Sequence, residues 1–217
     1  MPQFFKLFRN SSTTAGAPPL ASSQERVSRH STGFQEFTKV IHAGEGLAVL
    51  DLGPTSPDNI HCITSLGHKI YNVDVLLAST DPALLRKTED GAVTLDVEQF
   101  FAENLVFRGE QFDAVMLWSV ADYLPEPLVK PLVERIHSVM RPGGMLLGFF
   151  HTKDAGPQAP YHRYHIAGPD TLELQQVPRF RLQRVFNNRH IENLFQNFKS
   201  LKFFLTRDHT REVLVVR

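Results

Sequence analysis

Two acidic residues, Asp51 and Asp74, end two predicted strands at residues 47–51 and 68–74. The first strand is an apolar run, as is typical of buried parallel strands. A helix is expected between them, because Ser56 is a favourable N-cap before an amphipathic stretch. Strand, turn, helix and strand make a nucleotide-type βαβ unit. In such a unit the second acid is well placed to bind the hydroxyl groups of a ribose.

The turn between the first strand and the helix disfavours a phosphate-bearing ligand. A dinucleotide site needs G-x-G-x-x-G, but only Gly53 is present here. Pro54 and Pro57 have no backbone N–H to offer, and Asp58 adds a repelling charge. These residues argue against an NAD-type oxidoreductase and favour a phosphate-free ligand such as S-adenosylmethionine. The alternative is a helix N-terminus that is capped for stability alone.

This segment resembles the first two motifs of class I, Rossmann-like S-adenosylmethionine-dependent methyltransferases. The family's first motif is acid-x-Gly-x-Gly-x-Gly, and Asp51 and Gly53 match its first two anchors. Thr55 and Pro57 occupy the later glycine positions, where side chains crowd the approach that glycine leaves open. Asp74 matches the ribose-binding acid. The resemblance implies S-adenosyl-L-methionine as cofactor, with the following candidate binding residues: Asp51, Gly53, Pro54, Thr55, Asp74 and Ser119.

The resemblance extends over roughly residues 47 to 151. Residues 111–119 resemble the family's "FDxV" fourth strand, and a helix is predicted from about 127 to 140. The "RPGG" sequence at 141–144 then ends that helix before a fifth strand. One family feature is missing, because Phe101 stands where an adenine-contacting acid is expected. Residues 96–104 instead predict a short helix, which leaves room only for a short third strand near residues 92–94.

The C-terminal region fits the end of the same fold. Residues 189–198 predict a helix, and residues 201–207 and 211–217 predict a two-stranded hairpin. The expected fold is therefore a single α/β domain over residues 32–217. It is a Rossmann-like three-layer sandwich with a mostly parallel, six- or seven-stranded sheet and an antiparallel C-terminal hairpin.

The N-terminal segment and the composition favour a protein of the cytoplasm. Residues 1–31 are predicted to be disordered, and a helix follows at 32–43. The first nine residues are too short and interrupted for a signal-peptide core. The chain has one cysteine, which suits a reducing compartment. No apolar run approaches the roughly 20 residues of a membrane span.

Charge is distributed unevenly although the net charge is zero. Residues 32–160 carry 9 Lys/Arg and 17 Asp/Glu, whereas residues 161–217 carry 10 and 5. A basic C-terminal third could attract an anionic partner. Because no basic motif is interleaved with aromatic residues, nucleic acid is not the expected partner. A small-molecule acceptor is expected instead.

Ligands in this architecture lie beyond the carboxyl ends of the strands. Ser119, Asp122, Tyr123 and His151 are therefore predicted to lie near the transferring methyl group. An alcohol or phenol acceptor needs a base, for which His151 is the first candidate, followed by Asp122 and Tyr123. His151 could equally be a strand-end residue that is bonded to a neighbour.

Residues 152–188 are the candidate substrate lid, or else a loop that packs its aromatic side chains on the domain. His162 and His165 have ligand-like spacing, but neither cysteine nor carboxylate accompanies them, so no metal is expected.

The sequence therefore predicts an S-adenosylmethionine-dependent methyltransferase that acts on a small-molecule acceptor. The alternative is a non-catalytic member of the same fold that serves as a binding or partner module. The missing glycines and the missing third acid motivate that alternative.

Overall fold

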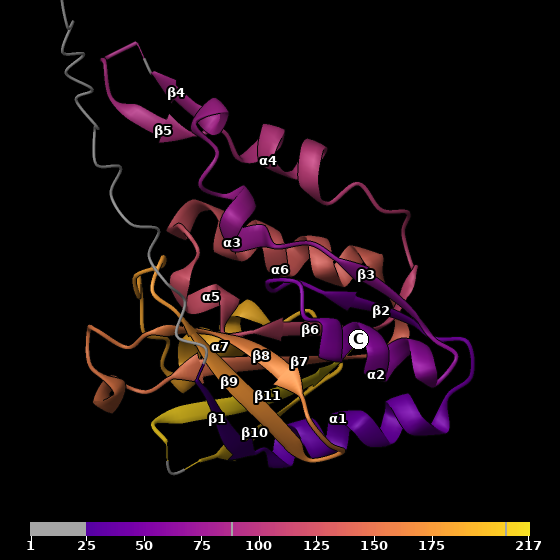
Figure 1. The fold of residues 1–217 in the computed structure, drawn as a ribbon. Coiled ribbons are helices and arrows are strands. Elements are labelled where there is room, and N and C mark those ends of the chain that lie inside the picture. The colour runs from indigo at the N-terminus through magenta and orange to yellow at the C-terminus, as the bar shows by residue number, and fades with distance from the viewer. Residues whose placement is uncertain (1–24, 88, 207) are drawn as a thin grey trace, which may run out of the picture.

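The computed structural model describes residues 25–87, 89–206 and 208–217. At its centre is a six-stranded sheet with the strand order β10-β11-β7-β6-β2-β3 (Figure 1). Its strands are β2 (Ala48–Asp51), β3 (Lys69–Asn72), β6 (Phe112–Trp118), β7 (Met140–His151), β10 (Ser200–Leu205) and β11 (Thr210–Val216). Strands β2, β3, β6 and β7 run parallel, whereas β11 is antiparallel to both β7 and β10. The predicted mostly parallel sheet with a C-terminal antiparallel hairpin is confirmed.

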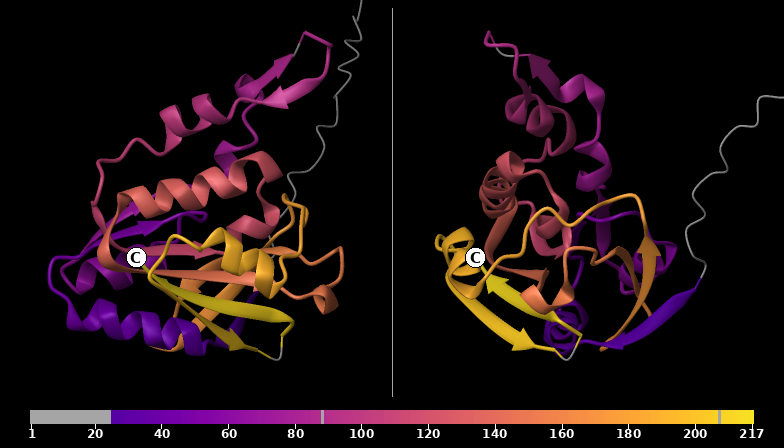
Figure 2. Two further views of the ribbon diagram at one scale, coloured as in Figure 1. Left: turned by 180° about the vertical axis from the view of Figure 1, so that it is seen from behind. Right: turned by 90° about the vertical axis from the view of Figure 1, so that its left-hand side faces the viewer.

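Helices cover both faces of this sheet and make a three-layer sandwich (Figure 2). Helices α1 (Thr32–Ala43) and α2 (Pro57–Ser65) pack on one face. The opposite face is covered by α3 (Val75–Ala78), α4 (Val97–Asn104), α5 (Val120–Tyr123), α6 (Glu126–Val139) and α7 (Asn188–Leu194). Neighbouring residues of β6 belong to different layers: Met116 packs with α1, whereas Leu117 packs with α6. This alternation follows from the two-residue period of a strand.

The helix boundaries follow the capping residues. Ser56 accepts a hydrogen bond from the Asn59 backbone N–H at 3.3 Å, and Pro57 occupies the first helical position. Ile60 is exposed, so Ile63 is the buried apolar residue of α2. Within the described residues, no helix combines the length and apolarity that a membrane crossing requires.

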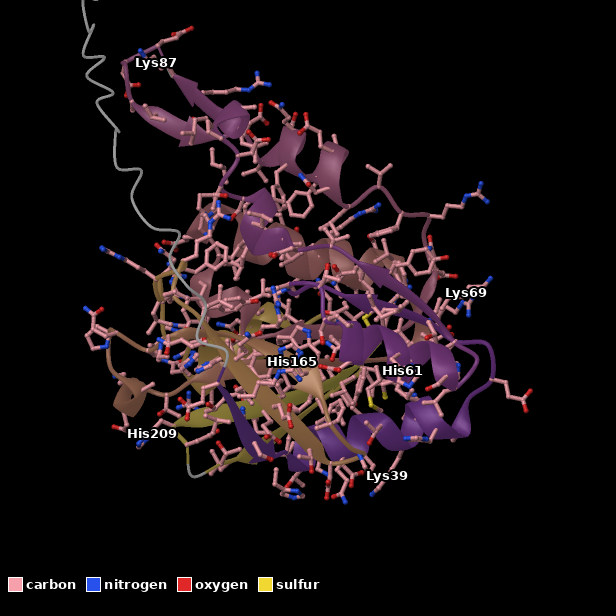
Figure 3. The ribbon with its side chains drawn as sticks, viewed as in Figure 1. Lys39, His61, Lys69, Lys87, His165 and His209 are labelled. Atoms are coloured by element: carbon pink, nitrogen blue, oxygen red, sulfur yellow. The ribbon has the colours of Figure 1, made fainter. Side chains whose placement is uncertain are left out.

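The predicted third strand does not join the central sheet. Strand β5 (Val93–Leu95) pairs instead with β4 (Leu85–Lys87), which follows the short helix η1 (Pro82–Leu84). This hairpin projects from the α3–α4 layer, with Lys87 at its far end (Figure 3). Val93 is 59% exposed, so the strand has too little buried apolar surface to compete for a place in the core.

A second sheet has the order β1-β9-β8 and corrects two expectations. Strand β1 (Arg26–His30) lies in the segment predicted to be disordered, and the rest of that segment, up to residue 24, lies outside the described residues. Strands β8 (Tyr161–Ile166) and β9 (Thr171–Val177) form a hairpin within the candidate lid, after the short helix η2 (Lys153–Ala155). The pairing of β9 with β1 depends on contacts that are distant in sequence, which local residue patterns do not reveal.

A buried ion pair fastens β1 to the central sheet. Glu212 on β11 is completely buried and accepts hydrogen bonds from Arg29 at 2.9 Å and from the backbone N–H of Gly33 at 2.6 Å. A Cβ atom at Gly33 would lie 2.9 Å from the Glu212 carboxylate, so this position requires glycine. The carboxylate thus joins β1, the first turn of α1 and β11.

Replacing Glu212 with Gln should lower the free energy of unfolding by about 3 kcal/mol, because it removes the buried charge partner of the Arg29 guanidinium and leaves only the exposed Asp208. The control is Glu173→Gln, which removes an exposed pair with Arg26 and should change stability by less than about 1 kcal/mol. Urea unfolding measures both values. Equal losses in the two variants would contradict the role given to Glu212.

Candidate active site

Asp51 lies at the carboxyl end of β2, buried and bonded entirely within the chain. Its Oδ1 accepts hydrogen bonds from the indole Nε1 of Trp118 at 2.7 Å and from the backbone N–H of Gly53 at 3.1 Å. Its Oδ2 accepts one from the Asn59 amide at 3.1 Å. Burial raises the pKa of Asp51 to about 6. The crevice predicted beside this acid therefore already contains an internal hydrogen-bond donor.

The Trp118 indole occupies the space above the first turn. A Cβ atom at Gly53 would lie only 2.8 Å from the Trp118 ring. Glycine at this position therefore leaves the space that the Trp118 indole occupies. The ring stacks on Tyr164 of β8, with centroids 5.0 Å apart and planes 4° apart. Trp118 also has a φ of 52°, a left-handed conformation that costs a bulky residue roughly 1–2 kcal/mol.

Strand β8 closes the crevice from above. Asn59 donates to the carbonyl of Tyr164 at 3.1 Å and accepts from the backbone N–H of Ile166 at 2.8 Å. Ser56 and the ring of His165 are 2.9 Å apart, and Figure 3 shows His165 beside α2. The N-terminus of α2 is thus covered by β8.

Tyr161, the first residue of β8, is buried between Tyr123 and Phe180, at ring distances of 5.0 and 5.4 Å. Its hydroxyl has no hydrogen-bond partner among the described residues. Burial, together with the charges of Asp74 and Asp51, raises its pKa well above the usual value. The Tyr161 ring lies in the same apolar cluster as Leu52 and Val75, the residues that directly follow the two strand-end acids.

The remaining predicted cofactor residues lie around this filled crevice. Asp74 is half-buried and caps α3 by accepting from the Leu77 backbone N–H at 3.0 Å. Burial raises its pKa, and Arg163 and Arg179 oppose that rise. Pro54 and Ser119 are buried, and Thr55 is exposed. Their assignment to a cofactor stays a prediction.

The predicted catalytic residues His151 and Asp122 form a buried pair. Oδ2 of Asp122 accepts from the backbone N–H of His151 at 2.6 Å and lies 2.8 Å from the ring Nδ1. Because an ionised carboxylate only accepts hydrogen bonds, Nδ1 is the donor in this contact and Nε2 is the ring nitrogen that does not face Asp122. Burial raises the pKa of Asp122, and the hydrogen bonds from His151 oppose the rise.

Tyr123 lies beside this pair but is engaged elsewhere. Its hydroxyl is 3.0 Å from the carbonyl of Ala159 and 2.9 Å from that of Pro160, and it donates to one of them at a time. Burial raises its pKa far above the usual value. Tyr123 therefore holds the loop before β8 and is a poor candidate for a base.

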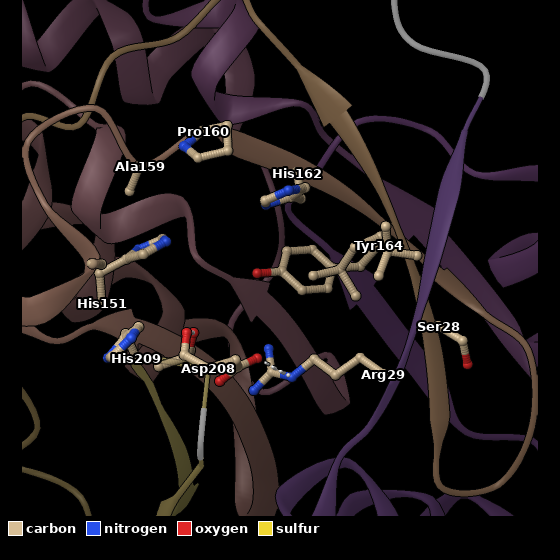
Figure 4. Close-up of a pocket in the computed structure, with 13 residues that line it drawn as sticks. Ser28, Arg29, His151, Ala159, Pro160, His162, Tyr164, Asp208 and His209 are labelled. Carbon is tan, nitrogen blue, oxygen red and sulfur yellow. Dashed lines mark hydrogen bonds and ion pairs between the residues drawn. The ribbon is translucent and has the colours of Figure 1, made fainter.

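A cavity of about 420 Å³ opens beside His151. Figure 4 shows the His151 ring directed toward the space between His162 and Tyr164. Arg29 borders the cavity and is paired with Asp208 at 2.9 Å as well as with Glu212. Burial lowers the pKa of His162 and favours its neutral form. The other lining residues include Val27, Ala155, Ala159, Pro160 and Leu174.

His162 and His165 are not brought together. Both lie on β8, where an odd spacing directs side chains to opposite faces. His162 borders the cavity, whereas His165 lies 3.1 Å from Asp58 beside α2. Among the described residues, no cluster of three or more ligand-type side chains could hold a metal ion.

Trp118, Asn59 and Tyr161 are the residues of the site that sequence reasoning missed. Each contacts a residue that is remote in sequence: Trp118 bonds Asp51, Asn59 bonds the Tyr164 carbonyl, and Tyr161 packs on Tyr123. The only available signal was the aromatic cluster at residues 161–165.

Asp51 should make stability depend on pH. Its pKa is raised from 3.8 to about 6, so the folded state binds a proton more tightly than the unfolded chain between these values. The stabilisation that protonated Asp51 contributes is fully present below pH 3.8 and is lost as the pH rises through about 6. The contribution of Asp51 to the free energy of unfolding falls by about 3 kcal/mol over this range. Urea unfolding should show the advantage of the wild type over Asp51→Asn shrinking across this range. A constant difference would contradict the burial argument.

Comparison with known proteins points to one family. Residues 50–148 match the family model described as "Methyltransferase domain". A ubiquinone biosynthesis O-methyltransferase of Cereibacter sphaeroides is 27% identical over 103 residues, which cover 48% of this chain and 40% of that protein. The corresponding protein of Dinoroseobacter shibae is 28% identical with the same coverage. The matched segment thus spans less than half the length of these relatives.

Solved structures give distant similarities. A 1,6-didemethyltoxoflavin-N1-methyltransferase of Burkholderia thailandensis, bound to 1,6-didemethyltoxoflavin and S-adenosylhomocysteine, is 14% identical over 86% of this chain and 78% of that chain, with a TM-score of 0.48. A SAM-dependent methyltransferase of Methanosarcina mazei is 17% identical over 82% of this chain and 96% of that chain, with a TM-score of 0.49. Residues 50–148 and the strand order thus resemble those of the class I, Rossmann-like S-adenosylmethionine-dependent methyltransferase family.

Proposed function

We propose that this chain transfers a methyl group from S-adenosylmethionine to a hydroxyl group of a small acceptor molecule. The observation that carries the proposal is the buried Asp122–His151 pair, which lies at the carboxyl end of β7 and opens onto a cavity of about 420 Å³. The cavity lies where ligands of open α/β sheets bind. The matched relatives are named O-methyltransferases, which supports a hydroxyl acceptor.

His151 and Asp122 have different roles in the proposed general-base catalysis. Nε2 of His151 takes the proton of the acceptor hydroxyl, so that the acceptor oxygen becomes a better nucleophile. Asp122 fixes the ring through Nδ1 and stabilises the positive charge that the imidazole gains. Apolar side chains in the cavity walls, such as Val27 and Leu174, suit an uncharged acceptor.

S-adenosylmethionine is the cofactor of this family. The strand-end acids Asp51 and Asp74 have the chemistry for its ammonium and ribose groups. However, Trp118 already donates to Asp51, and Tyr161 fills the space near both acids. The crevice in this arrangement therefore has the acidic groups that S-adenosylmethionine needs, but side chains of the chain itself fill its space. Strand β8 must shift before the cofactor can enter.

Asp74→Ala should weaken S-adenosylmethionine binding at least tenfold, because one charge-assisted hydrogen bond contributes on the order of 1.5 kcal/mol or more. Isothermal titration calorimetry measures this. The matched control is Asp96→Ala, which removes the N-cap of α4, away from the crevice, and should leave affinity unchanged.

Absence of binding at millimolar cofactor, both by the folded wild type and by a folded variant that lacks the Tyr161 ring, would overturn the proposal. That outcome would favour the second candidate, a non-catalytic binding module, for which the filled crevice is the specific supporting observation.

His151→Ala should slow methyl transfer to a phenolic acceptor by about 100-fold or more, because the base is lost. The assay is transfer from labelled S-adenosylmethionine to catechol and hydroquinone. The control is His209→Ala, which alters the same cavity without touching the Asp122 pair. Equal rates for His151→Ala and the wild type on an accepted phenol would exclude His151 as the base.

A further inference from the structure

Residues 156–166, here called the strap, connect the cavity to the filled crevice. The strap consists of the loop 156–160 and β8. Side chains alternate along it: Tyr161 lies near the strand-end acids, whereas its neighbour His162 lines the cavity. A displacement of the strap therefore changes both sites at once.

Two groups of contacts hold the strap down. Near its start, the Tyr123 hydroxyl lies within 3.0 Å of the carbonyls of Ala159 and Pro160. Near its end, Asn59 bonds the backbone of Tyr164 and Ile166. The first group is a single side-chain hydroxyl beside Gly156, which has a φ of 76° and no Cβ to restrict it. The start of the strap is thus its weaker end.

The closed arrangement also contains unfavourable features. The Tyr161 hydroxyl is buried without a protein partner, which costs roughly 1–3 kcal/mol. Trp118 keeps a left-handed backbone conformation beneath Tyr164. The cost of the unpaired Tyr161 hydroxyl is released when the start of the strap lifts, so the closed state is held less firmly than its burial suggests.

We propose that the strap is an internal gate on the cofactor crevice, with Tyr161 as its plug and the Tyr123 hydroxyl as its latch. This inference rests on the proposed function. The fully buried Tyr161 ring belongs to the same apolar cluster as Leu52 and Val75, which directly follow Asp51 and Asp74, and so takes the space that the cofactor needs there. Because only the open fraction of molecules binds, the apparent affinity is reduced by that fraction. Removing the plug or the latch therefore tightens binding.

Calorimetry of the full chain with S-adenosylmethionine tests the gate. Tyr161→Ala should lower the dissociation constant at least tenfold. Tyr123→Phe, which removes only the latch hydroxyl, should lower it about fivefold. The matched controls are Tyr71→Ala and Tyr71→Phe, because Tyr71 packs on Phe107 and Phe112, away from the crevice, and should leave the constant unchanged.

The outcomes separate the gate from the proposed function. Wild-type binding that is not tightened by either variant overturns the gate and leaves the proposed function standing. Absence of binding by the wild type and by folded Tyr161→Ala overturns both. Binding by Tyr161→Ala alone supports both.

Hydrogen exchange of the wild type covers the case in which Tyr161→Ala does not fold. Saturating S-adenosylmethionine should accelerate amide exchange in residues 161–164, because the strap lifts, while exchange in β6 slows. Slower exchange in both segments would overturn the gate.

Discussion

The site is organised by one buried carboxylate. Asp51 is 1% exposed, and both of its oxygens accept hydrogen bonds from within the chain. A charge removed from water in this way must be paired or fully hydrogen-bonded. Trp118 and Asn59 meet that need, and both also contact β8, through the Tyr164 ring and through the β8 backbone. The position of β8 is therefore coupled to the solvation of Asp51.

That coupling explains why the second sheet matters for chemistry. Strand β8 carries residues of the crevice and of the cavity. Its position is fixed by the second sheet, in which β8 pairs with β9 and β9 pairs with β1. Arg29 on β1 is in turn anchored by the buried Glu212. A segment that looks peripheral in the chain thus connects the two places where the cofactor and the acceptor are proposed to bind.

The sequence was sufficient to predict the elements whose signals are local. The cap at Ser56, the strand that ends in Trp118 and the C-terminal hairpin were all predicted from spacing and residue type. Strand β1 was missed because its partner β9 is more than 140 residues away.

The candidate site was predicted only in part, again because some of its contacts join residues that are distant in sequence. His151 and Asp122 were both expected near the transferring methyl group because they lie at the carboxyl ends of predicted strands, and they form a pair at 2.8 Å. The indole above Gly53 was not foreseen, because nothing local indicates that Trp118 turns back onto Asp51. The role of Asp74 toward a cofactor stays a prediction.

The Trp118 indole donates its hydrogen bond to the Asp51 carboxylate at the position that a bound cofactor needs. Trp118 is the only tryptophan of the chain, so its indole N–H gives one assignable signal in a ¹H–¹⁵N spectrum. We expect that signal to exchange slowly with water, to titrate with a midpoint of about 6, and to shift when S-adenosylmethionine is added. An indole N–H that exchanges rapidly and responds neither to pH nor to the cofactor would contradict the account.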